Sequence, residues 1–311
     1  MRICSLIPGA TEVVAMLGLT EHLVGISHEC DYPPSVRQVP VMVEPVIDHE
    51  VMESAAIDRR IKALVSSNQP LYRLDARAFV NSRPDTILTQ DLCHVCAVTP
   101  DQLRQAIQSL ASPPRLMTLN PASLFDVLDD VERIGAFLGE PARGRELARS
   151  LRTRVSAARA KSNETRPRVL CLEWLSPPYI GGHWVPEMVN LAGGEDVLGK
   201  IGQPSRQGTW DEIHVASPDI VVIMPCGFSV ARIVSELSAL FRTDENWSRV
   251  LRSWSKIYAV DASSYFSRPG PRLVDGLELL ASIFSGNLPP ECDQAMVREI
   301  TASHILASES R

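Results

Sequence analysis

Short apolar runs alternate with segments of helical periodicity along most of this chain, and no other feature limits its possible folds so strongly. An apolar run of strand length followed by an amphipathic helix is the repeating unit of a parallel sheet covered by helices. The alternation therefore predicts the α/β class. The expected strands are Ile3–Ile7, Leu23–Ser27, Ala63–Ser66, Thr86–Thr89, Arg115–Leu119, Arg168–Glu173, Ile220–Met224 and Lys256–Val260.

The alternation stops between residues 122 and 162, where no strand signal occurs. Residues 123–138 carry apolar side chains at helical spacing, and Gly139-Glu140-Pro141 then interrupts the pattern. A second helix is expected from Pro141 to Lys161, because proline suits the first turn of a helix. At about 1.5 Å per residue this helix is about 30 Å long, which is enough to join two compact domains.

The two parts of the chain that flank these helices repeat each other. Glu12–Gly18 is followed by Leu23–Gly25, and Glu187–Gly193 is followed by Val197–Gly199. Each copy comes after an expected strand and a loop. We therefore predict two Rossmann-like lobes with parallel sheets, joined by a single long backbone helix, with a ligand cleft between the lobes. The expected divisions are an N-terminal lobe at 1–121, linking helices at 122–166, a C-terminal lobe at 167–290 and a tail at 291–311.

Charge and composition narrow the range of partners. The formal net charge of −6 offers no basic face, so we expect no nucleic acid partner. No window holds the roughly 18 consecutive apolar residues of a membrane-spanning helix, so we expect no membrane insertion. Residues 1–7 run into Pro8-Gly9 without the apolar core of a signal peptide. The sequence as written therefore predicts a cytoplasmic protein, and a periplasmic one if translation begins upstream.

The loops that follow the expected strands hold most of the binding chemistry, because ligands of open α/β sheets bind beyond the carboxyl ends of the strands. Aromatic residues make up only 5% of the chain, yet six of them fall in these loops. Aromatic faces beside Pro- and Gly-rich backbone suit a broad, flat, apolar ligand, unless the rings only plug the ends of the lobes. The candidate ligand-binding residues are Pro8, Gly9, His28, Tyr32, Gln90, Trp174, Tyr179, Gly182, His183, Trp184, Cys226, Gly227, Phe228, Tyr265, Phe266 and Arg268.

Four motifs resemble those of one known family. They are SLIPGATE at 5–12, GISHECDYP at 25–33, GHWVPE at 182–187 and YFSRPGPR at 265–272. Over about residues 1–285 the chain is similar to the cobalamin-binding, periplasmic-binding-protein-like family of class III, also called helical-backbone metal receptors. The resemblance implies two α/β lobes bridged by one helix, little hinge motion, and a corrinoid or similar metal chelate in the cleft. It also implies an ABC permease as partner if the chain is exported.

Two glutamates need separate consideration, because exported relatives use a surface glutamate on each lobe to meet arginines of the permease. Glu12 and Glu187 lie at matching positions of the internal repeat. Each begins an expected helix, where a carboxylate stabilises the positive end of the helix dipole. We therefore expect both to act within their own lobes.

His183 is the candidate metal ligand, with His28 in reserve. It follows two glycines, and a neutral imidazole is a competent axial ligand for the cobalt of a corrinoid. The alternative is an imidazole that only makes hydrogen bonds or faces solvent. Arg268 precedes the rigid segment 269–271, and its guanidinium can bind an amide, carboxylate or phosphate of the ligand.

Cys93 and Cys96 have the spacing of a two-thiolate metal pair, but a structural zinc site needs four ligands and no second pair exists. Three interpretations stay open for them: bound zinc or iron, a redox role, or ordinary reduced loop cysteines. No phosphate-cradling glycine loop occurs, so we expect no nucleotide cofactor.

Three functions are consistent with these observations. We favour non-catalytic binding of cobalamin or a related corrinoid, for trafficking, storage, sensing or uptake. The second is an ABC-importer substrate-binding protein for haem or an iron–siderophore chelate. The third is a thiol- or metal-dependent enzyme that uses Cys93 and Cys96, although no Ser-His-Asp order and no His-Glu-x-x-His helix supports it.

Overall fold

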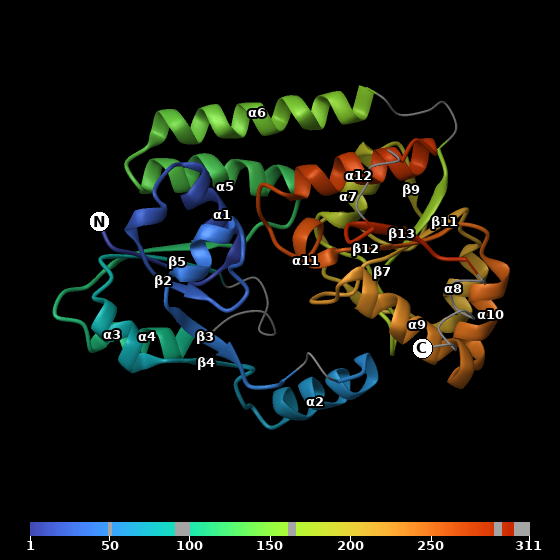
Figure 1. Cartoon of the computed structure of the whole chain (residues 1–311), viewed down its shortest axis with the longest axis horizontal. Coiled ribbons are helices and arrows are strands. Elements are labelled where there is room, and N and C mark those ends of the chain that lie inside the picture. The colour runs from blue at the N-terminus through green and yellow to red at the C-terminus, as the bar shows by residue number, and fades with distance from the viewer. Residues whose placement is uncertain (49–51, 91–99, 161–165, 289–293, 302–311) are drawn as a thin grey trace. The chain divides into compact units, whose positions relative to one another are not determined.

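A computed structural model describes residues 1–48, 52–90, 100–160, 166–288 and 294–301 of the chain (Figure 1). The chain divides into two compact units. Unit 1 comprises Met1–Pro121, Phe125–Leu151 and Pro269–Pro271. Unit 2 comprises Ala122–Leu124, Arg152–Arg268 and Arg272–Arg311. Each unit is an α/β structure built on its own sheet, as the alternating sequence pattern predicts.

Unit 1 contains a six-stranded sheet in the order β4-β3-β2-β1-β5-β6. Its neighbouring strands are parallel except for the antiparallel pair of β3 and β4. The strands are β1 (Ile3–Ser5), β2 (Leu23–Ser27), β3 (Val41–Pro45), β4 (Tyr72–Leu74), β5 (Thr86–Gln90) and β6 (Arg115–Leu119). The helices are α1 (Pro8–Met16), α2 (Ser54–Ser66), α3 (Ala76–Ser82), α4 (Pro100–Gln108), α5 (Leu124–Phe137) and the first part of α6 (Pro141–Ala160).

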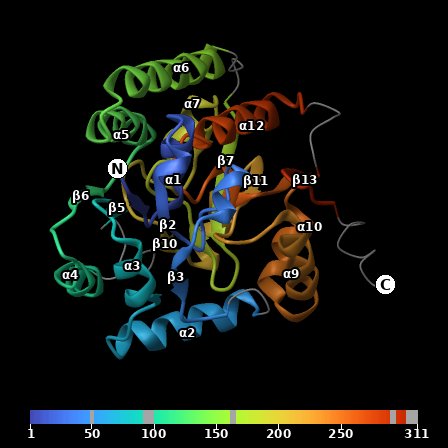
Figure 2. The same ribbon diagram turned by 60° about the vertical axis from the view of Figure 1, so that its left-hand side comes forward.

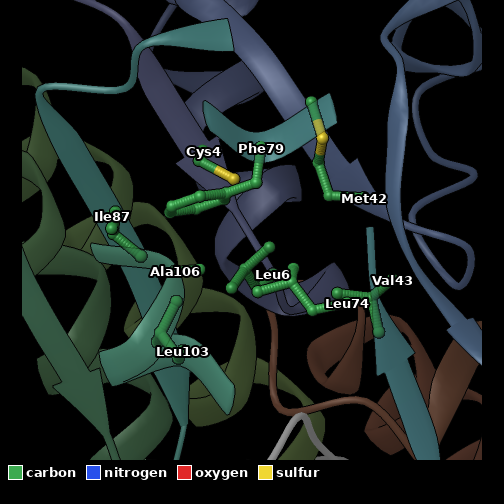
Figure 3. Close-up of a cluster of buried hydrophobic side chains, with 9 residues drawn as sticks. All are labelled: Cys4, Leu6, Met42, Val43, Leu74, Phe79, Ile87, Leu103 and Ala106. Carbon is green, nitrogen blue, oxygen red and sulfur yellow. The ribbon is translucent and has the colours of Figure 1, made fainter. Parts of the chain in front are cut away.

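The core on one face of this sheet is formed by α3 and α4. Phe79 of α3 is fully buried, and Leu103 and Ala106 of α4 lie beside it (Figure 3). The strands contribute apolar side chains to the same cluster, and the whole set is Cys4, Leu6, Met42, Val43, Leu74, Phe79, Ile87, Leu103 and Ala106. The removal of this apolar surface from water holds the helices on the sheet.

The expected strand at Ala63–Ser66 is wrong, because these residues form the last turn of α2. Leu64 and Val65 read as a short apolar run, but Val65 is 52% exposed, so the run does not mark a buried strand. The strands β3 and β4 were not expected from the sequence. They lie at one edge of the sheet, where short strands with polar members such as Arg73 are tolerated.

Unit 2 contains a sheet in the order β10-β8-β7-β11-β12-β13, with β9 paired to β7. Its central strands β7, β11 and β12 are parallel, and they confirm the three strands expected in this part of the chain. The strands are β7 (Arg168–Trp174), β8 (Tyr179–Ile180), β9 (Glu195–Asp196), β10 (Arg206–Gln207), β11 (Ile220–Ile223), β12 (Ile257–Val260) and β13 (Val297–Glu299). The four short additional strands lie in loops or at the edge of the sheet.

The helices of unit 2 cover both faces of its sheet. Helices α7 and α12 pack together on one face, and α9 and α10 lie side by side on the other (Figure 1, Figure 2). Side chains cap several of their N-termini, including a capping box formed by Thr209 and Glu212 at α8. The helices are α7 (Val185–Leu191), α8 (Trp210–Ala216), α9 (Val230–Thr243), α10 (Glu245–Ser253), α11 (Ala262–Tyr265) and α12 (Leu273–Ser285).

The two linking helices confirm the sequence prediction to within a residue at each end. The 20-residue helix α6 begins in unit 1 and ends in unit 2. Within unit 1, α5 and α6 approach so closely that a Cβ atom on Gly135 would lie 2.7 Å from the Cα atom of Gly144. Two glycines are therefore required where the helices meet, since backbone atoms cannot give way. In the described part of the chain, no helix has the length and apolar character needed to cross a membrane.

We expect Gly135→Ala to lower the free energy of unfolding by about 1–3 kcal/mol, because the new methyl group collides with the backbone of α6. Urea unfolding followed by circular dichroism measures the change. Ala136→Ser adds an atom at the next, exposed position of α5 and should change stability by less than about 0.5 kcal/mol. Equal effects of the two substitutions would contradict close packing of the helices.

Candidate functional site

The carboxyl ends of β1 and β2 in unit 1 carry the first group of candidate residues. Pro8 is the first residue of α1, and Gly9 follows it. A Cβ atom on Gly9 would lie 1.9 Å from the carbonyl oxygen of Pro269, so segment 269–271 packs directly on the first turn of α1. Gly9 is buried and serves this contact. Arg268, the residue before the segment, is half-buried in unit 2.

His28 follows β2 and is fixed by backbone contacts. Its Nδ1 atom lies 3.1 Å from the carbonyl oxygen of Val43, which can only accept, so Nδ1 carries the proton. The Nε2 atom lies 3.4 Å from an Oε1 of Glu29. The imidazole also contacts the ring of Tyr72, with 5.6 Å between centroids. Tyr32, in the loop after β2, is 42% exposed.

The aromatic candidates of unit 2 divide into buried and half-buried side chains. Phe228 is fully buried, with Trp174 edge-on at 5.2 Å and the guanidinium of Arg232 3.5 Å from its ring centroid. Trp184 is also buried, and its indole N–H donates to the carbonyl oxygen of Phe266 at 2.7 Å. The buried rings thus pack within the unit. The half-buried aromatic candidates are Trp174, Tyr179 and Tyr265.

The remaining candidates lie near the carboxyl ends of β5 and β11. Gln90 is the last residue of β5 and is half-buried. Cys226 follows β11 and is exposed, and Gly227 has a φ of 79°, a left-handed conformation that favours glycine. Cys93 and Cys96 lie outside the described residues. Among the residues described, no group of three or more His, Cys, Asp and Glu side chains is arranged to hold a metal ion.

The loop at 181–184 is held by a second loop of unit 2. The N–H of His183 donates to the carbonyl oxygen of Gln203 at 2.6 Å, and the N–H of Gly202 donates back to His183 at 2.9 Å. A Cβ atom on Gly182 would lie 2.3 Å from the backbone nitrogen of Ser205, so only glycine fits there. His183 has a φ of 51°, which is strained for a residue with a side chain.

Glu173 is not among the candidate residues predicted from the sequence. It lies near the end of the largely apolar strand β7. Its Oε1 accepts from the N–H of Gly182 at 3.1 Å, and its Oε2 accepts a short hydrogen bond from the hydroxyl of Ser205. Burial raises the pKa of Glu173 to about 7, and the nearby charge of Asp196 adds to the effect. A carboxylate that directly follows four buried residues of a strand is unusual, and this is the signal that could have revealed Glu173.

Burial also shifts the pKa values of two other groups in this part of unit 2, Asp196 and His183. Burial raises the pKa of Asp196 to about 6, although the backbone N–H groups of Gly199 and Leu198 donate to its Oδ1. Burial lowers the pKa of His183, which favours the neutral imidazole. A neutral imidazole can bind a metal centre through a ring nitrogen.

The two glutamates of the repeat differ in their roles. Glu187 lies in the first turn of α7, as expected, and its Oε2 also accepts from the backbone N–H of Leu124 at 2.6 Å. It therefore stabilises the beginning of α5 as well. The expected position of Glu12 at the start of a helix is wrong, because Glu12 is the fifth residue of α1, which begins at Pro8. Its side chain is only 2% exposed, as fits the expectation that it acts within its own lobe.

We expect Glu173→Gln to stabilise the protein at about pH 8 but not at about pH 5, by on the order of 2 kcal/mol. The pKa of Glu173 is about 7 in the folded protein and lies above its ordinary value of 4.5. Its folding contribution is therefore complete below pH 4.5 and is lost as the pH rises through 7. Urea unfolding at both pH values measures the difference.

The control is Glu195→Gln, which removes an exposed carboxylate from β9 of the same sheet. At about pH 8 its effect on stability should be smaller than that of Glu173→Gln, because the side chain that it replaces is exposed. An equal pH dependence for both variants would contradict the burial of a titrating Glu173.

Sequence comparison finds relatives along most of the chain. Residues 3–250 match the family described as periplasmic binding protein. A vitamin B12-binding protein of Vibrio parahaemolyticus is 23% identical over 283 residues, which cover 89% of this chain and 86% of that protein. A vitamin B12-binding protein of Vibrio cholerae is 22% identical over 284 residues, with the same shares covered.

Solved structures share the fold at low sequence identity. A periplasmic haem-binding protein of Pseudomonas aeruginosa has a TM-score of 0.68 at 19% identity, covering 96% of this chain and 98% of that one. The periplasmic vitamin B12-binding protein of Vibrio cholerae has a TM-score of 0.64 at 20% identity, covering 92% and 97%. Because the family match spans well over half of the sequence, the chain belongs to the periplasmic binding protein family.

Proposed function

We propose that this chain is a non-catalytic binding protein for cobalamin or a related corrinoid. The half-buried aromatic side chains near the carboxyl ends of the unit 2 strands support this proposal most directly, because their exposed faces can pack on a flat macrocycle. We call Trp174, Tyr179, His183 and Tyr265 the ligand edge. In unit 1, His28 and Gln90 lie at the carboxyl ends of β2 and β5, and Tyr32 follows in the loop after β2. The relatives named as vitamin B12-binding proteins support the choice of ligand.

Haem is the second candidate ligand. Haem-binding proteins of Pseudomonas aeruginosa and of a Roseiflexus species share the fold as closely as the vitamin B12-binding protein does, with TM-scores of 0.68, 0.66 and 0.64. Haem and corrinoids are both flat macrocycles with a metal that accepts an axial ligand. The ligand edge therefore suits both, and the choice between them rests on a binding measurement.

The family description supports a periplasmic location over the cytoplasmic one expected from the first residues. We accordingly propose that the chain delivers its ligand to an ABC permease. A structural relative from Listeria monocytogenes is named an ABC transporter substrate-binding protein, with a TM-score of 0.68 at 17% identity. The Cys93 and Cys96 pair, on which the enzymatic alternative rests, lies outside the described residues.

We expect the protein to bind one aquocobalamin per chain, measured by calorimetric and absorbance titration. Trp174→Ala and Tyr265→Ala should each weaken binding by about 1–3 kcal/mol, as expected when a large contact ring is lost. Trp254→Ala is the matched control, because Trp254 is also half-buried but precedes β12 at the opposite end of the strand. A titration that shows no heat and no spectral change with any cobalamin would contradict the proposal. If the protein binds haemin tightly and no cobalamin, haem is the ligand and the corrinoid assignment is wrong.

We expect His183→Ala to change the visible absorption spectrum of bound aquocobalamin, because burial favours the neutral imidazole and a neutral imidazole can act as an axial ligand of cobalt. His22→Ala is the control, since His22 lies in a short helix of unit 1 that precedes the amino end of β2. An unchanged spectrum with His183→Ala would show that the imidazole only packs against the ligand.

A further inference from the structure

We propose that Glu173 is a positioning residue for the ligand, because its carboxylate ties the loop at 181–184 to the loop at 202–205 and so sets where His183 points. The inference rests on the proposed function, since the first loop carries part of the ligand edge. Glu173 itself does not need to touch the ligand. It acts through the backbone of Gly182 and the hydroxyl of Ser205.

The geometry makes Glu173 the bridge between the two loops. One carboxylate oxygen accepts from Gly182, which is the residue before His183. The other oxygen accepts from Ser205, which follows the segment that binds the backbone of His183. Because Glu173 extends from β7, which is paired with strands on both sides, it connects both loops to the middle of the unit 2 sheet. A carboxylate that accepts two hydrogen bonds from different segments fixes their relative position.

The direction of the His183 side chain depends on this backbone support. Among the described residues, no hydrogen bond holds the imidazole itself, and its ring contact is with Trp184 at 5.5 Å. The left-handed backbone of His183 is a strained conformation that persists only when its surroundings enforce it. Loss of the Glu173 bridge would release this strain and let the loop relax away from the ligand edge.

The groups around the Glu173 carboxyl determine its protonation state. Glu173 faces the acid Asp196 of β9, the buried thiol of Cys171 on its own strand, and the two hydrogen-bond donors. Burial raises the pKa of Cys171 well above its ordinary value, so that thiol stays neutral. The pKa of Glu173 is about 7, so both of its forms are present near neutral pH. Because burial favours the protonated carboxyl, ionisation of Glu173 weakens the closed arrangement, and the loop should be held less firmly as the pH rises through 7.

A ligand-free experiment tests the bridge directly. In the ¹⁵N-labelled full chain, the amide resonance of Gly182 should titrate with a midpoint near pH 7. Asp196→Asn removes the neighbouring charge and should lower this midpoint, whereas Ser205→Ala removes a donor and should raise it. Glu173→Gln should abolish the titration. A Gly182 amide that does not titrate, or that still titrates in Glu173→Gln, would overturn the proposal.

Ligand affinity supplies the second readout. Aquocobalamin and haemin are each titrated at about pH 6.5 and about pH 8, and the ligand that binds should bind about fivefold more tightly at the lower pH, where the protonated carboxyl of Glu173 favours the closed loop. Glu173→Gln keeps one acceptor and should bind without this pH dependence, whereas Glu173→Ala should bind more weakly at both values. If Glu173→Gln and Glu173→Ala weaken ligand binding equally, Glu173 has only a structural role and the proposal is wrong. If neither ligand binds the wild-type protein, the proposed function fails, and the Gly182 titration still decides whether the bridge exists.

Discussion

The parallel arrangement of the central strands is the constraint on which the rest of the structure depends. Parallel strands leave all their carboxyl ends at one edge of the sheet, so loops that are far apart in the sequence meet there. In unit 2 this brings the loop after β7 together with the loops after β11 and β12. The candidate residues of this unit gather for that reason and not because they are close in the sequence. The same rule places His28 and Gln90 at the corresponding edge of unit 1.

Buried rings and half-buried rings at this edge have different tasks. Trp184 and Phe228 are buried, and they stabilise the loops in which they lie. The rings of Trp174 and Phe228 pack in a T-shaped contact, and Trp174 itself is only half-buried. The loops are further fixed by hydrogen bonds from the backbone and from Glu173. Such preorganisation favours ligand binding, because little conformational entropy is left to lose when the ligand arrives.

Elements that depend mainly on neighbouring residues could be predicted from the sequence. Helices α5 and α6 could be predicted to within a residue, because Gly139 and Pro141 separate two clear helical periods. Strand β6 could be predicted at its observed bounds for a similar reason, since an apolar run ends there in a polar turn. The strand expected at 63–66 is wrong, because so short an apolar run fits the last turn of a helix as well as it fits a strand.

Features that depend on distant partners could not be predicted. The indole N–H of Trp184 binds a carbonyl group 82 residues further along the chain, and nothing near Trp184 in the sequence indicates this. Glu173 was expected only as the end of a strand, because its partners come from two other loops.

The most direct test of the whole account is a crystal structure of the protein grown with aquocobalamin. We predict the corrin ring against Trp174 and Tyr265, and a ring bound at the amino ends of the strands, or no bound ring at all, would contradict the account.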